Sequence, residues 1–82
     1  MSAVTVHLFA SYAESFGVKH LTIDLAPQST VADLIAELRS LPGSFVLPAT
    51  PRVAINKKFA ASDQLVRSTD EVALIPPVAG GF

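Results

Sequence analysis

The sequence contains no cysteine among its 82 residues. This absence excludes disulfide bonds, thiolate metal sites and a cysteine nucleophile. Histidine is scarce as well: only His7 and His20 occur, and two residues so far apart in the sequence make no metal-binding motif. Charge is sparse, with six basic and seven acidic residues and a formal net charge of −1. Because nucleic-acid binding needs a concentrated basic surface, we expect no nucleic-acid partner.

Long hydrophobic runs are also missing. No apolar stretch approaches the roughly 18 residues that a membrane span needs, so we expect no membrane-spanning segment. The N-terminus shows no basic segment followed by an apolar run and a cleavage site, so we expect no signal peptide and a cytoplasmic protein. What the sequence does have is 50% hydrophobic residues, which suit the small, dense core of one domain.

Alternating apolar and polar residues predict the strands. Val4, Val6 and Leu8 would share one face of the first strand, and Val72 and Leu74 one face of the last. Asn56-Lys57-Lys58 is typical of a turn, so the short segment after it would be an edge strand. The predicted strands cover residues 3–9, 20–25, 52–56, 59–60 and 71–75.

Two helices are predicted between these strands. Thr30 and Asp33 have the spacing of a capping box, and the apolar residues after Thr30 recur at helical intervals, as Val31, Leu34, Ile35 and Leu38. Pro42-Gly43 would end this main helix. A shorter helix is predicted over 11–16, with Ser11 and Glu14 as a second capping box and Gly17 as the left-handed residue after the last turn.

The order of these elements predicts an α+β fold. One main amphipathic helix would cross one face of a mixed sheet of four to five strands, which is the β-grasp, or ubiquitin-like, arrangement. The first and last strands would lie side by side at the centre of the sheet. We predict a β-grasp domain over residues 1–75 and an extended, flexible C-terminal Gly-Gly tail over residues 76–82.

The predicted tail joins a stiff base to a thin tip, Pro76-Pro77-Val78-Ala79-Gly80-Gly81-Phe82. Adjacent prolines hold a chain extended, and glycines have no side chain to obstruct a narrow channel. The segment 76–81 would reach about 20 Å at about 3.3 Å per residue. Such a tail suits delivery of a C-terminal carboxyl into another protein's active site. The alternative is an ordinary frayed chain end.

Residues 70–81 together resemble the ending of the small, sulfur-carrying subunit of molybdopterin synthase. That family ends in an Asp-Glu-Val strand, Pro-Pro-Val, one small residue and Gly-Gly. Leu8-Phe9-Ala10 resembles the end of the family's first strand, and Val53-Ala54-Ile55-Asn56 its middle strand. The resemblance covers essentially the whole chain. The thiamin-pathway sulfur carriers share the fold and the Gly-Gly but usually lack the paired prolines.

The resemblance implies a non-catalytic carrier subunit whose Gly81 bears a thiocarboxylate. An adenylating enzyme that uses ATP and magnesium would activate the Gly81 carboxylate, and a sulfur donor protein would supply the sulfur. The carrier would donate this sulfur to cyclic pyranopterin monophosphate on the large synthase subunit, which would hold the catalytic residues. No cofactor would be bound by this chain, and the assembly would be a heterotetramer of two carriers on a dimer of large subunits.

Phe9, Phe59 and Ile75 are predicted to fall on or near the sheet face opposite the main helix. An exposed apolar patch usually marks a partner site. The resemblance implies that the large subunit and the activating enzyme dock on overlapping parts of this surface. The alternative is that one or more of the three residues caps the core.

Phe82 departs from the family pattern, because a residue after Gly81 keeps the Gly81 carboxyl in a peptide bond. We favour a precursor from which a protease removes Phe82. The alternatives are that Phe82 is a non-native residue, or that it blocks the carrier chemistry of a docking-only domain. The alternative functions are a ubiquitin-like protein modifier and a sulfur carrier for tRNA thiolation or thiamin synthesis.

Overall fold

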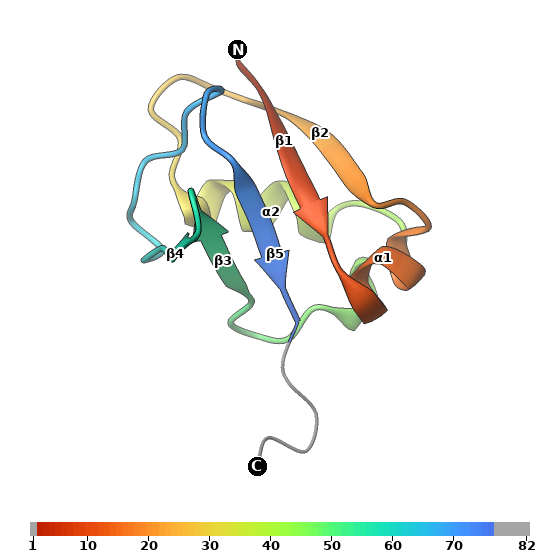
Figure 1. Ribbon diagram of the computed structural model, residues 1–82. Coiled ribbons are helices and arrows are strands. Elements are labelled where there is room, and N and C mark those ends of the chain that lie inside the picture. Colours follow the sequence, from red (N-terminus) through yellow and green to blue (C-terminus); the bar gives the residue numbers. More distant parts are fainter. Residues whose placement is uncertain (1, 77–82) are drawn as a thin grey trace.

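The computed structural model describes residues 2–76 (Figure 1). The predicted tail residues Pro77, Val78, Ala79, Gly80, Gly81 and Phe82 therefore lie outside the described residues, and the division between domain and tail stays a prediction. The elements in chain order are β1 (Ser2–Leu8), α1 (Ala10–Phe16), β2 (His20–Leu25), α2 (Val31–Arg39), the 3-10 turn η1 (Ser44–Val46), β3 (Arg52–Ile55), β4 (Lys58–Phe59) and β5 (Val72–Ile75).

The five strands form one mixed sheet in the order β2-β1-β5-β3-β4. The central strands β1 and β5 are parallel, and the other neighbours are antiparallel. This arrangement confirms the predicted β-grasp fold, with the first and last strands side by side. Leu8 pairs with Leu74, so β1 and β5 end at the same edge of the sheet.

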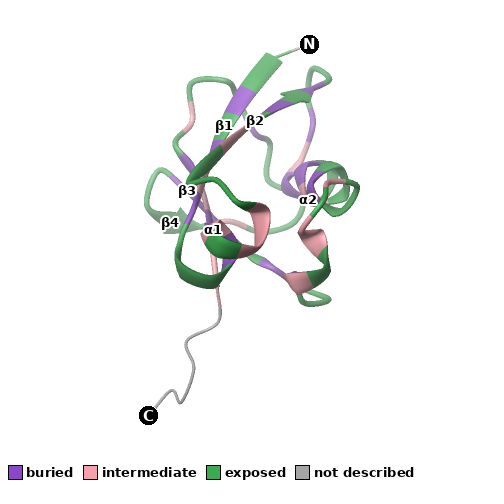
Figure 2. Ribbon diagram, turned by 90° about the vertical axis from the view of Figure 1, so that its right-hand side faces the viewer, coloured by how far each residue is buried: buried purple, intermediate pink, exposed green. Residues whose placement is uncertain are grey.

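The helix α2 covers one face of the sheet, as the edge-on view shows (Figure 2). The core lies between them and is built by the alternation that predicted the strands: Val4, Val6, Val72 and Leu74 are fully buried. Leu34 and Leu38 of α2 are buried against them. Neither described helix lies over the other face of the sheet, which we call the open face (Figure 1). Neither is long and apolar enough to span a membrane.

The start of α2 matches its predicted capping box. The Thr30 backbone N–H donates to the Asp33 carboxylate at 2.8 Å, and the Asp33 N–H donates to the Thr30 hydroxyl at 3.3 Å. The helix ends at Arg39, earlier than the expected stop at Pro42. The Ser40 hydroxyl donates to the Glu37 carbonyl, which satisfies an acceptor of the last turn before the proline is reached.

The start of α1 differs from the prediction. Phe9 is the N-cap, and its carbonyl accepts hydrogen bonds from the N–H groups of Tyr12 and Ala13. Ser11 therefore lies inside the helix, and the predicted capping box of Ser11 with Glu14 is wrong. The physical reason is tertiary: Tyr12 is buried in the core, and its burial sets where the helix begins. The predicted left-handed residue Gly17 is confirmed, with φ of 79°.

Tyr12 generates a prediction about stability. Its hydroxyl is buried and has no hydrogen-bond partner among residues 2–76. A buried hydroxyl without a partner carries an uncompensated desolvation cost. We therefore expect Tyr12→Phe to stabilise the protein by about 1 kcal/mol in urea unfolding at pH 7. A loss of more than about 1 kcal/mol would show that the hydroxyl has a partner, such as a buried water.

The same residue predicts a dependence on alkaline pH. Burial raises the pKa of the Tyr12 phenol above its ordinary value of 10.0. Above pH 10 the unfolded chain ionises while the folded chain keeps its proton, so stability falls as the pH rises. The Tyr12→Phe variant should lack this part of the fall, and Tyr12 is the only tyrosine in the chain. Equal losses in the two proteins between pH 9 and pH 11 would contradict the assignment.

Candidate docking site

The register of the five strands aligns one row of side chains across the open face. His20 lies opposite His7, His7 beside Ala73, Ala73 opposite Ala54, and Ala54 opposite Phe59. Two imidazoles occupy one end of this row, two methyl groups its middle and a phenyl ring its far edge. Because the central side chains are small, the face is lower in the middle than at the β4 edge.

A hollow of about 360 Å³ lies over the small central residues. Ala54 and Ala73 form its floor, and the structure places all three predicted contact residues around it: Phe9, Phe59 and Ile75. Phe9 is 49% exposed and Phe59 is 64% exposed, and neither belongs to the buried core cluster. The structure therefore brings the three residues together, and their role as partner contacts stays a prediction.

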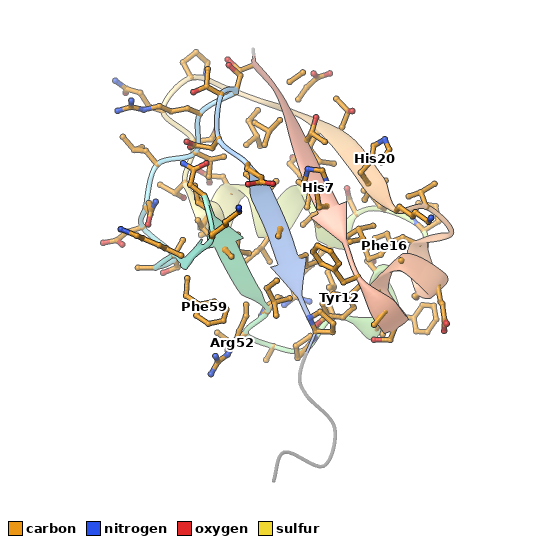
Figure 3. All side chains as sticks on the ribbon, in the orientation of Figure 1. His7, Tyr12, Phe16, His20, Arg52 and Phe59 are labelled. Atoms are coloured by element: carbon orange, nitrogen blue, oxygen red, sulfur yellow. The ribbon has the colours of Figure 1, made fainter. Side chains whose placement is uncertain are left out.

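Phe59 forms the outer wall of the hollow. It lies on the edge strand β4, and the Arg52 guanidinium stacks over its ring at 5.1 Å from the centroid (Figure 3). A cation over an exposed aromatic ring contributes about 0.5–1 kcal/mol. Arg52 therefore restricts the motion of the exposed Phe59 ring. It also places a positive charge beside this apolar side of the hollow.

A polar network holds the rim of the hollow in place. Asn56 and Lys57 form the two-residue turn between β3 and β4, with φ of 54° and 71°. The Asn56 side chain donates to the Asp70 carboxylate at 3.1 Å and accepts from the Glu71 N–H at 2.9 Å. The hairpin is thereby tied to the start of β5. Lys57 and Glu71, which line the hollow, are positioned by this network.

Sequence reasoning placed Asn56 at the end of the strand 52–56 and in the turn that follows, but not in a hydrogen-bond network. The signal that was available is the residue type, because asparagine is among the few residues that tolerate a positive φ and also bond nearby backbone. Its partner Asp70 could not be inferred, because the contact depends on where β5 enters the sheet. Asp70 is itself fixed, since its carboxylate accepts the Arg67 N–H at 2.9 Å.

The described surface meets the requirements of a metal site and of a docking site to different degrees. Within residues 2–76 no group of three or more histidine, aspartate or glutamate side chains could hold a metal ion. An exposed apolar hollow with a polar rim is the form of a protein-docking site. Ile75 lines this hollow and Pro76 follows directly, so β5 ends beside it.

The family model described as the ThiS family matches residues 6–81. The chain belongs to the ThiS family. It is 32% identical over 79 residues to the molybdopterin synthase sulfur carrier subunit of Arabidopsis thaliana, covering 95% of this chain and 82% of that protein. It is 36% identical over 78 residues to the protein of the same name from Dictyostelium discoideum, covering 90% and 91%. The resemblance seen in the sequence is thereby confirmed.

Solved structures of similar proteins share the fold of this ThiS-family chain. Small archaeal modifier protein 1 from Haloferax volcanii superposes with a TM-score of 0.82 and 26% identity, covering 95% of this chain and all of that one. A structure from Helicobacter pylori contains the complex of subunits 1 and 2 of molybdopterin-converting factor. One chain of that structure superposes on this chain with a TM-score of 0.71 at 22% identity. That match covers 96% of this chain and 99% of that one, and it supports the β-grasp fold alone.

Asn56 offers a test of how the rim is held. Asn56→Gly keeps the positive φ accessible but removes both side-chain hydrogen bonds, so we expect a loss of about 1–2 kcal/mol. Asn56→Ala adds the strain of a left-handed alanine and should cost about 1 kcal/mol more. Urea unfolding of the two variants and the parent protein measures both the loss of the hydrogen bonds and the added backbone strain. If Asn56→Gly unfolds like the parent, the network does not stabilise the rim.

Proposed function

We propose that this ThiS-family chain is the sulfur carrier subunit of a molybdopterin synthase, with a thiocarboxylate on Gly81. The observation that carries the proposal is the family match over residues 6–81, which ends at Gly81 rather than at Phe82. Two relatives named as this subunit, each at least 32% identical over nearly the whole chain, support the same function.

The chemistry needs only a terminal carboxylate from this chain. The Gly81 carboxylate attacks the α-phosphate of ATP on an activating enzyme that holds magnesium, which forms an acyl adenylate and releases pyrophosphate. Sulfur at the sulfide oxidation level, supplied by a donor protein, then attacks the acyl carbon and displaces AMP, which leaves the thiocarboxylate. The sulfur of the resulting thiocarboxylate is transferred to cyclic pyranopterin monophosphate on the large subunit, and hydrolysis restores the carboxylate. A chain without cysteine suits this scheme, because the acyl carbon itself carries the sulfur.

The hollow on the open face supports the choice of partners. We propose that the large subunit and the activating enzyme both seat an apolar side chain between Phe9, Phe59 and Ile75. Because Pro76 leaves β5 at this hollow, a protein docked there also receives residues 77–81. One shared surface makes the two complexes mutually exclusive, so the carrier must leave one partner before it meets the other.

Phe82 must be absent from the working form. We propose that a protease removes it, since the peptide bond to Phe82 leaves Gly81 without a carboxylate to activate. A protein that retained Phe82 would dock and remain inactive as a carrier. The protease would recognise a Gly-Gly sequence followed by a bulky residue.

A ubiquitin-like protein modifier is the second candidate function. The observation that favours it is the similarity to a protein named as a modifier, small archaeal modifier protein 1, at a TM-score of 0.82. Both functions begin with adenylation of a terminal glycine. They differ in the acceptor, which is a sulfur atom for the carrier and a lysine amine for the modifier.

Activation provides the first test. A protein ending at Gly81 should support pyrophosphate exchange by the cognate activating enzyme, whereas the form ending at Phe82 should not. A form ending at Gly80 is the matched control for length. Intact-mass analysis after addition of a sulfur donor should show replacement of one oxygen by sulfur on the Gly81 form. Failure of exchange by the Gly81 form would contradict the carrier function, and Gly81–lysine conjugates in cells would favour the modifier.

Docking provides the second test. Phe59→Asp should weaken binding to the large subunit at least tenfold, because it places an unpaired charge in an apolar contact. Phe45→Asp is the matched control, since Phe45 is 88% exposed on η1 and does not line the hollow. Titration calorimetry measures both affinities. Equal affinities for the two variants would remove Phe59 from the interface.

A further inference from the structure

The fold brings together the only two histidines of the chain, which the sequence separates. His7 on β1 lies directly opposite His20 on β2. The next pair along these strands is the hydrogen-bonded one, because the Leu8 N–H donates to the Lys19 carbonyl at 2.8 Å. His7 and His20 therefore form a non-hydrogen-bonded pair, the type in which opposite side chains of an antiparallel ladder are closest.

The two imidazole rings lie on neighbouring strands of the open face (Figure 3). Their centroids are 6.3 Å apart and their planes are inclined at 50°. A zinc ion bound at about 2.0–2.1 Å from one nitrogen of each ring needs centroids roughly 5 Å apart. His20 is exposed and His7 is half-buried, so a small rotation of the exposed ring closes this gap.

The ring nitrogens are available to a ligand. Among the described residues, neither imidazole is engaged in a hydrogen bond or an ion pair with another side chain. The adjacent row on the same two strands is Thr5 opposite Thr22, and the neighbour of His7 on β5 is Ala73. None of these neighbours carries a positive charge that would repel a cation.

We propose that His7 and His20 form a two-histidine site for a divalent transition-metal ion. Imidazole nitrogens suit zinc, nickel and copper, and copper(II) should bind most tightly of the three. Residues 2–76 supply no third histidine or carboxylate at this point, so water completes the coordination. The ion would lie over the β1–β2 pair, on the side of His7 away from Ala73, with its open positions directed away from the sheet. The site does not depend on the proposed sulfur-carrier function.

The test is zinc(II) binding by calorimetry with the full, untagged chain. We expect one zinc ion per chain, and at least a tenfold loss of affinity in both His7→Gln and His20→Gln. A double variant, His20→Thr with Thr22→His, is the matched control. It keeps two histidines on the open face but places them diagonally, about 7–8 Å apart, and should also bind at least tenfold more weakly. Equal affinity in the parent and any of these variants would overturn the site.

A second measurement observes the ligands directly. Because the chain has only two histidines, their imidazole signals in ¹H–¹⁵N spectra can be assigned from the two single variants. Both sets of signals should move together and reach their end point at one equivalent of zinc(II). Zinc that binds while either ring signal stays unchanged would show that another group holds the ion, and the proposal would be wrong.

Discussion

The parallel pairing of β1 with β5 is the constraint on which the rest of this structure depends. Parallel neighbours cannot be joined by a tight turn, so the chain between them must cross over the sheet. The main helix α2 lies in that connection and covers one face, while the other face stays open. Because the two strands run the same way, they end together: Phe9 follows β1 beside the end of β5, and Pro76 follows Ile75.

The two faces of the sheet differ in burial. The face under α2 provides stability, since Val6, Leu74 and Leu34 are fully buried there. On the open face, Phe59 is 64% exposed. An aromatic ring so exposed contributes little to folding and normally lowers the solubility of the protein. Arg52 stacking and the Asn56 network hold this exposed wall and its rim in one arrangement. A rim that is already ordered has less entropy to lose when a partner binds.

The features predicted from sequence are those with local causes. Alternation in β1 and the capping box of Thr30 with Asp33 depend on residues close in the chain, and the structure has both. Ser11 failed as a cap because burial of Tyr12, a tertiary effect, shifted the start of α1. The proposed role of Gly81 rests on family resemblance, because two glycines at a chain end are a weak physical signal.

The features that sequence reasoning missed all depend on strand register. Asn56 meets Asp70, and His7 meets His20, only because particular strands pair with a particular offset. Such offsets are set by the packing of the core residues rather than by the surface residues that the offsets bring together. A shift of one residue in β1 would turn Val6 toward solvent and His7 into the core, so the core permits a single register.

This coupling explains how a chain of 82 residues can vary the side chains of its open face without weakening its fold. In a strand of period two, every residue chosen for the core places its neighbour on the opposite face. Burial of Val6 and Leu8 in β1 therefore places His7, which lies between them, on the open face. Substitutions on the open face would therefore leave the register intact, because the register is maintained by the buried face.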